Sequence, residues 1–457
     1  MKRIKIILLP LLSFPSIFFL LLALGKEGSI KFINRGYIKE QNTSLILGLT
    51  YLFFWFLFVY RNRKRKELDL YDIFFLSLFF YSILSIPKLF NLTYFAEHFV
   101  YLANSLCHFR LDILPSGYID DPVIHNGKIY VAFPPFPALL MIPFALIFKT
   151  KFHDFIFQVL FGSLNVSLFF ELSKRYIEIL KISVSKFYKI LIPITFGFGT
   201  VHLSILHFEG VWYVAHTVSV TFLLLAIIET LKKRRFFLVG LFWSFSIMTR
   251  FHLILAFPYF IFIALEKDSS LFSRKNIRNV AILLIPVIAV LILMGVYNYL
   301  RFGDFKDFGY LKMRLNEPYS EYIKSGQFNI KFLPKNLYYM LLAPPKFQKG
   351  FPFFKPDPWG MGIIFCSPIF LLLYRSLSKK IIPLLSWTSI FLILIPILLY
   401  YTTGGAQYGY RFIMDFLPFL VILFVESTNG KIKTYEYFLI LISILVNLRG
   451  IFWEFIF

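Results

Sequence analysis

Residues 278–299 read RNVAILLIPVIAVLILMGVYNY, and Arg278 is the only charged residue among them. A helix needs about 20 consecutive apolar residues to cross the hydrocarbon core of a bilayer. Runs of this kind recur along the whole chain, at 5–24, 44–60, 73–90, 153–172, 187–206, 211–231, 236–250, 251–265, 278–299, 359–375, 380–401, 411–426 and 434–454. The sequence therefore predicts an all-α integral membrane protein with about 13 transmembrane helices.

The composition of the chain favours the same class. Of its 457 residues, 58% are hydrophobic and 16% are charged, whereas soluble domains carry roughly 25% charged residues. The net charge of +23 would suit nucleic acid, but the basic residues lie in short loops such as 61–66. Loops of this kind mark the cytoplasmic side of a membrane protein and meet anionic lipid. We expect a multi-pass protein of the cytoplasmic membrane, with lipid as a partner and no nucleic acid.

The sequence gives no sign of a disulfide framework, of a cysteine metal site or of a cleaved signal peptide. Cys107 and Cys366 have no spacing that indicates a disulfide framework or a metal site. Met1-Lys2-Arg3 and the apolar run that follows resemble a signal peptide, but the run is too long and no small-residue cleavage site follows it. We interpret it as the first membrane anchor.

The basic loops also predict the orientation of the chain. With the N-terminus inside, the strongest basic loops all lie on the cytoplasmic side if the proline-rich segment 132–149 does not cross. The alternative is that 132–149 crosses and the basic loop 173–189 lies outside. The first arrangement divides the chain into two helices with a basic loop (1–72), a transmembrane core (73–426) with external loops 91–131 and 300–358, and a C-terminal helix (427–457).

Arg250 divides two short apolar halves, 236–249 and 251–265. A charged residue at membrane depth is costly and is therefore a candidate for function. One reading is a turn arginine that reaches the lipid headgroups. The other is a guanidinium that binds a phosphate, for which its planar fork is well suited.

Arg411 and Asp415 lie four residues apart, on one face of a predicted helix. They form either a plain intrahelical ion pair or part of a site. The preceding turn, 404–410, is rich in glycine and ends in Tyr410. Glycine allows the backbone to approach a ligand closely, and tyrosine offers both a stacking face and a hydroxyl.

The first long external loop holds several acids and histidines: Glu97, Asp112, Asp120, Asp121, His98, His108 and His125. A carboxylate at the mouth of a membrane cavity suits a general base, although any one of these acids could equally be a solvated loop residue. Their spacing is not diagnostic of a metal site. A second group, His202, His207, Glu209, Trp212 and His216, is read as interfacial anchors or as a site.

Several motifs occur in an order that resembles a known superfamily. They are Glu97–Ala103, Asn126–Leu140, Gly199–His202, Met248–Arg250, Tyr297–Gly303 and Gln407–Arg411. Together they resemble the membrane glycosyltransferases of the GT-C type, which include the protein O-mannosyltransferases and the aminoarabinose transferases. The resemblance covers roughly 73–426.

The resemblance implies a glycosyltransferase that moves a sugar from a polyprenyl-phosphate carrier to a lipid, glycan or protein acceptor outside the membrane. In the superfamily a carboxylate of the first external loop is a base or a metal ligand. Here that role falls on Glu97 or Asp121, and a divalent cation is left open. Arg250 is expected to bind the carrier phosphate. Further substrate contacts are expected from Arg411, Tyr410, His98, Lys128, Tyr130 and Asp415.

Two other functions share these features. A flippase or transporter of lipid-linked glycans would use the same arginines without a catalytic carboxylate, but transporters tend to show inverted repeats, and we see none. A polymerase or ligase of lipid-linked glycans would share the spans, the arginines and the external loops.

Overall fold

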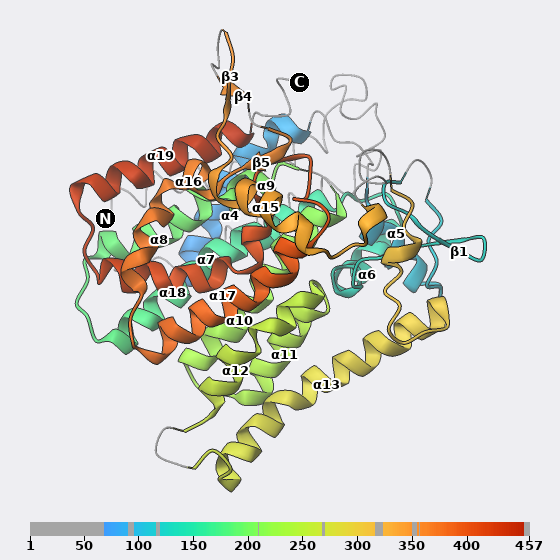
Figure 1. Cartoon of the computed structure of the whole chain (residues 1–457), viewed down its shortest axis with the longest axis horizontal. Helices are drawn as coiled ribbons and strands as arrows, with labels where there is room; N and C mark the ends of the chain where they lie inside the picture. Colours follow the sequence, from blue (N-terminus) through green and yellow to red (C-terminus); the bar gives the residue numbers. More distant parts are fainter. Residues whose placement is uncertain are drawn as a thin grey trace.

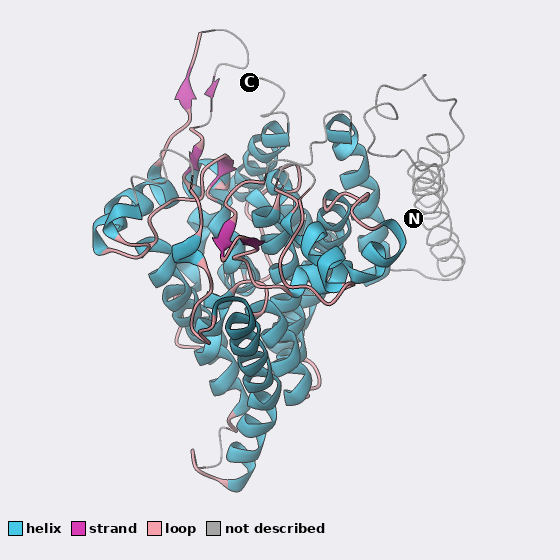
Figure 2. Cartoon of the chain, turned by 90° about the vertical axis from the view of Figure 1, so that its right-hand side faces the viewer, coloured by secondary structure: helices cyan, strands magenta, loops and turns pink. Residues whose placement is uncertain are grey.

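Helices make up nearly all of the regular structure, and the strands are short (Figure 2). A computed structural model describes residues 68–89, 96–115, 119–208, 210–266, 270–315, 323–349, 354–355 and 357–451. The predicted spans 5–24 and 44–60, the basic loop 61–66 and Glu209 lie outside the described residues.

Short connections join most neighbouring helices along the chain (Figure 1). The α-helices are α4 (Leu70–Leu89), α5 (His98–Leu106), α6 (Phe136–Phe148), α7 (Phe155–Leu180), α8 (Lys186–Phe198), α9 (Val201–Ile205), α10 (Val211–Leu231), α11 (Phe236–Ile247), α12 (Phe257–Ala264), α13 (Arg274–Phe302), α15 (Leu333–Leu337), α16 (Ile363–Cys366), α17 (Ile381–Leu399), α18 (Leu417–Thr428) and α19 (Thr434–Ile451). The 3-10 helices are η1 (Phe251–Ala256), η2 (Tyr310–Lys312), η3 (Ile323–Ser325), η4 (Ile330–Phe332), η6 (Pro368–Ser376) and η7 (Arg411–Asp415), and η5 (Tyr338–Leu342) is a π-helix.

Six short strands pair into three small sheets, which are β1 (Val123–His125) with β2 (Lys128–Tyr130), β3 (Lys346–Phe347) with β4 (Phe354–Lys355), and β5 (Trp359–Met361) with β6 (Gln407–Gly409). Strands β1 and β2 form a hairpin whose turn is Asn126-Gly127, both with positive φ, as a tight two-residue hairpin turn requires. Strands β5 and β6 are parallel and join two distant parts of the chain.

Five of the described helices are long and apolar enough to cross a membrane: α7, α10, α13, α17 and α19. Helix α13 shows why lipid is the expected surrounding. It runs along one side of the molecule (Figure 1), and Ile285, Ile292 and Leu293 on it are each more than half exposed. A continuous apolar face of this kind is disfavoured in water. The chain is therefore a mostly helical membrane protein.

The predicted count of about 13 spans is wrong, because several apolar runs are broken within the described residues. Pro418 is at the start of α18, so the run 411–426 becomes a 3-10 turn followed by a 12-residue helix. The run 359–375 holds a four-residue helix and a 3-10 helix. The run 187–206 is divided after Phe198. An apolar run is thus not sufficient for a straight spanning helix.

The segment 132–149 contains α6, which has 13 residues. At 1.5 Å per residue it is about 20 Å long, shorter than a hydrocarbon core of about 30 Å. This length agrees with the prediction that the segment does not cross. The assignment of segments to the inside and the outside stays a prediction.

The two long loops predicted to be external meet each other. The backbone N–H of Arg314 donates to the carbonyl of Pro122 at 2.9 Å, and Val123 pairs with Met313. At the end of α13 the Arg301 guanidinium donates to the carbonyl of Val131 at 2.6 Å. Both loops therefore lie at the same face of the helix bundle, as the predicted topology requires.

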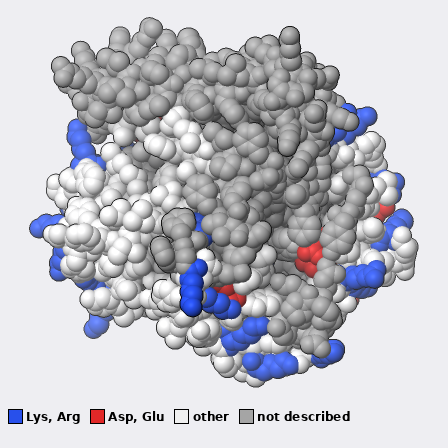
Figure 3. Space-filling model, turned by 90° about the horizontal axis from the view of Figure 1, so that it is seen from above, with Lys and Arg blue, Asp and Glu red and all other residues white. Residues whose placement is uncertain are grey.

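The remaining helices pack around a core in which α10 contacts both α7 and α11. Figure 3 shows described Lys and Arg side chains at both sides and in the lower part of one face of the molecule.

Candidate functional site

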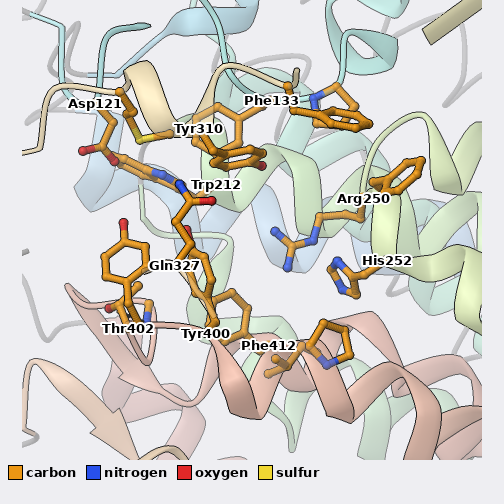
Figure 4. Close-up of a pocket in the computed structure, with 18 of the residues that line it drawn as sticks. Asp121, Phe133, Trp212, Arg250, His252, Tyr310, Gln327, Tyr400, Thr402 and Phe412 are labelled. Atoms are coloured by element: carbon orange, nitrogen blue, oxygen red, sulfur yellow. Dashed lines mark hydrogen bonds between the residues drawn. The ribbon is translucent and has the colours of Figure 1, made fainter. Parts of the chain in front are cut away.

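A cavity of about 960 Å³ lies where the two long loops meet the ends of α10, α11 and α17. Its charged lining residues come from distant parts of the chain: Asp120, Asp121, Arg250, Asp304, Lys306, Asp307 and Arg411. Aromatic rings contribute much of the rest of the wall: Phe133, Phe208, Trp212, Tyr213, Phe251, Phe308, Tyr310, Phe328, Tyr400, Tyr401 and Phe412. Figure 4 shows Asp121 at one end and Arg250 with His252 at the other. The cavity thus brings together three residues predicted from the sequence, Asp121, Arg250 and Arg411.

Asp121 has a φ of 51°, in the left-handed region that aspartate adopts more readily than most residues other than glycine. Burial raises the pKa of Asp121 to about 7, and the neighbouring Asp120 adds to the effect, while the positive charge of Arg411 opposes it. A carboxyl group with a pKa near neutrality can take up and release a proton, as a general base must.

Arg411 lies 6% exposed in the wall of the same cavity. Its guanidinium donates to the carbonyl of Gly404 at 2.7 Å and stacks near the rings of Trp212 and Tyr213. No ion pair joins Arg411 to a carboxylate among the described residues. Carbonyl oxygens and rings hold the guanidinium in place without cancelling its charge, so the cavity presents a cation to an anionic ligand.

The turn before Arg411 requires glycine at one position. Gly404 has a φ of +113°, and a Cβ there would lie 3.0 Å from Nε of Arg411. The glycine-rich stretch was predicted to let the backbone approach a ligand. In the structure Gly404 and Gly405 line the cavity, and the carbonyl of Gly404 also accepts a hydrogen bond from the Arg411 side chain.

Arg250 is paired, unlike Arg411. Its Nε and Nη2 atoms donate to the two carboxylate oxygens of Asp415 at 3.0 and 2.6 Å. Asp415 is fully buried and also contacts Nδ1 of His216 at 3.1 Å and Nε2 of His252 at 2.8 Å. The possible intrahelical pair between Arg411 and Asp415 is therefore not formed: the five residues make a 3-10 turn, and Asp415 binds Arg250 from another helix end.

His252 lines the cavity beside Arg250 and was not singled out from the sequence. Its Nε2 lies 2.8 Å from a carboxylate oxygen of Asp415, so His252 belongs to the same polar network as Arg250. Its position two residues after Arg250 in a short turn was the only signal for it in the sequence.

Glu97, the other predicted catalytic acid, is 1% exposed and does not line the cavity. One of its carboxylate oxygens lies 3.3 Å from Nδ1 of His153, at the start of α7. Glu97 therefore faces a different part of the molecule from Asp121, and the two acids that the resemblance left open are separated.

His98 ties these two regions together. Its ring is fully buried, with Nδ1 2.9 Å from the carbonyl of Ala96 and Nε2 2.6 Å from the carbonyl of Asp120. Burial lowers the pKa of His98, and the two carbonyl contacts oppose this. The His98 ring therefore holds the loop segment that carries Asp121 in place, but the ring itself does not line the cavity.

Three further predicted residues also lie outside the cavity wall. Lys128 is exposed in the β1–β2 hairpin, and Tyr130 beside it packs on Phe302. Tyr410 is buried and packs against Phe412. Their predicted contacts with substrate stay predictions.

The residues read as interfacial anchors divide between the core and the cavity. His202 is buried between the Tyr81 hydroxyl and the Asn165 amide, and His207 contacts the carbonyl of Leu84. Trp212 lines the cavity, and its ring is one of those near Arg411. Of the two interpretations, anchor or site, the position of Trp212 in the cavity wall favours the site.

No family model matches the sequence, and no curated protein or solved structure matches it either.

Proposed function

We propose that the protein is a membrane glycosyltransferase that moves a sugar from a polyprenyl-phosphate carrier to an acceptor hydroxyl outside the membrane. The observation that carries this proposal is that Asp121 and Arg411, distant in the sequence, line one cavity. A displacement with an anionic leaving group needs a proton acceptor and, near it, a cation that can hold the charge of the leaving group. Asp121 can supply the first, and Arg411, which has no carboxylate partner among the described residues, can supply the second.

The reaction divides between the two residues. The Asp121 carboxylate takes the proton of the acceptor hydroxyl, whose oxygen then bonds to the anomeric carbon. The bond between that carbon and the phosphate oxygen breaks, and polyprenyl phosphate leaves with its charge held by Arg411. A single displacement of this kind inverts the anomeric carbon.

The remainder of the cavity supports this choice of substrate. Tyr400, Tyr401 and Trp212 offer aromatic faces on which a sugar ring can stack. Pro396 and Ile397, near the end of the apolar helix α17, line the same space. A polar sugar phosphate can thus lie among charged and aromatic groups while its prenyl chain meets a helix that is long enough to face lipid.

Arg250 has a supporting part in this scheme. Its charge is already balanced by Asp415, so it orients the phosphate through its remaining donors while Arg411 supplies the uncompensated charge. The sequence analysis assigned the carrier phosphate mainly to Arg250, whereas this scheme assigns it mainly to Arg411.

The test is a transfer assay with the purified chain in lipid nanodiscs, using radiolabelled polyprenyl-phosphate sugars and extracted envelope lipids and glycans as acceptors. We expect release of polyprenyl phosphate together with a new labelled glycoside of inverted configuration. Movement of intact donor across the membrane of proteoliposomes, without cleavage, would instead indicate a flippase. A product that grows by whole glycan units would indicate a polymerase or ligase.

A further inference from the structure

A second group of polar residues is buried behind the cavity wall, at the start of α7. Glu97, His153 and Asp154 are 1%, 6% and 0% exposed. One donor atom from each lies within 4.8 Å of the others. One imidazole and two carboxylates gathered in this way offer a set of donor atoms that could hold a metal ion.

One hydrogen bond at His153 shows that its Nδ1 is an acceptor. The backbone N–H of Phe155 donates to Nδ1 of His153 at 3.1 Å, so Nδ1 carries a lone pair. The same nitrogen lies 3.3 Å from a Glu97 oxygen and 3.4 Å from an Asp154 oxygen. Three electron-rich atoms therefore converge with no hydrogen of His153 between them.

Asp154 provides a second observation. It is the residue before the first turn of α7, where an aspartate usually accepts a hydrogen bond from the exposed backbone N–H groups. Here it makes no such bond, and neither carboxylate oxygen accepts a hydrogen bond from a described residue. A buried carboxylate that neither caps its own helix nor binds another donor points to a missing ligand.

Gln158 lies one helical turn after Asp154, on the same face of α7. Its amide oxygen and nitrogen are also buried without a hydrogen-bond partner among the described residues. The unsatisfied polar atoms thus continue along this face of the helix beside the three residues.

The two distances from Nδ1 of His153 agree with a tetrahedral zinc ion, and the ligand types favour zinc over other ions. A tetrahedral zinc ion with bonds of about 2.0–2.1 Å holds neighbouring donor atoms about 3.3–3.4 Å apart. The two distances from Nδ1 of His153 are 3.3 and 3.4 Å. One imidazole and two carboxylates are ligands that zinc accepts, whereas calcium and magnesium favour oxygen ligands throughout.

We propose that Glu97, His153 and Asp154 form a zinc site that joins the start of α5 to the start of α7. Zinc would replace the Phe155 N–H as the partner of Nδ1. Glu97 precedes His98, which holds the carbonyl of Asp120 next to Asp121. The ion would therefore hold in place the loop that carries Asp121, without lining the cavity itself.

The test is the zinc content of the purified full chain after dialysis against a weak chelator, measured by mass spectrometry of the metal. We expect about one zinc per chain, and loss of it in Asp154→Asn and His153→Gln. His108 is an exposed histidine whose ring binds the carbonyl of Asn104, so His108→Ala should keep the zinc and serves as the matched control.

A second measurement uses only the wild-type chain, so it remains valid if the variants do not fold. Removal of zinc from the wild-type chain with a strong chelator should lower its thermal unfolding temperature, and added zinc, but not magnesium, should restore it. Wild-type protein without stoichiometric zinc and without this thermal response would overturn the proposal, as would full zinc retention in Asp154→Asn. Neither measurement depends on glycosyl transfer, so the site can stand if the proposed function fails.

Discussion

Two arginines in the cavity wall differ in their partners. Arg250 is bound by both oxygens of Asp415, which two histidines also contact. Arg411 is bound by backbone carbonyls and aromatic rings. The first region is an internally balanced ionic network, whereas the second presents a charge to the cavity. The comparison teaches that the partners of a buried cation decide how much of its charge is left for a ligand.

The largest expected effect is the loss of stability when the ionic network around Asp415 is broken. Arg250→Ala leaves the Asp415 carboxylate buried without its bidentate partner, and loss of one member of a buried pair costs about 3–5 kcal/mol. We expect this loss in the free energy of unfolding, measured by denaturant titration in detergent. The double variant Arg250→Ala, Asp415→Asn should recover a large part of it. Wild-type stability in the single variant would show that the pair is not a structural element.

The next effect concerns the proton acceptor. Asp121→Asn should lower the turnover of sugar transfer by about 100-fold, the scale of a lost general base, without loss of folded protein. Asp112→Asn is the matched control, because Asp112 is an acid of the same loop that pairs with Arg110. Equal turnover in the two variants would remove Asp121 from the mechanism.

The third prediction concerns the binding of carrier phosphate by Arg411. Arg411→Ala should weaken binding of polyprenyl phosphate by about 10- to 100-fold, which corresponds to a charge-assisted hydrogen bond of roughly 1.5–3 kcal/mol. Arg411→Lys should keep part of the affinity, since it keeps the charge and loses the planar fork. Titration of each purified variant with the carrier lipid would measure this, and unchanged affinity in Arg411→Ala would contradict the phosphate role.

A smaller effect follows from the raised pKa of Asp121. Because the pKa is about 7 in the folded chain and 3.8 ordinarily, the folded state binds the proton more tightly than the unfolded state. The stability from this group is therefore present below about pH 4 and is lost as the pH rises to about 7. Unfolding measured across this range should show a weaker pH dependence in Asp121→Asn than in the wild type.

The sequence predicted the helical membrane class, because long apolar runs such as 278–299 do form long helices. It overestimated the spans, since proline and glycine break runs of the same composition, as at Pro418. Arg250 and Arg411 could be selected individually because charges near apolar runs are conspicuous. Asp121 was one of several acids in the first long loop, and the resemblance singled it out together with Glu97.

Which residues meet could not be predicted in the same way. The pairing of Asp415 with Arg250 joins segments that are distant in the chain, whereas the local spacing pointed to Arg411. His153 and Asp154 looked like the ordinary polar start of a span, and Glu97 gave no sign that it faces them. Long-range contacts of this kind depend on how the helices pack.

The most direct test of the central claim is the pH dependence of the sugar-transfer rate in the wild type. If Asp121 is the base, the rate should rise as its carboxyl group loses a proton around pH 7, and it should level off above about pH 8. In Asp121→Asn the small residual rate should lack this rise. A wild-type rate that does not change between about pH 5 and pH 9, or the same rise in Asp121→Asn, would contradict the assignment of Asp121 as the base.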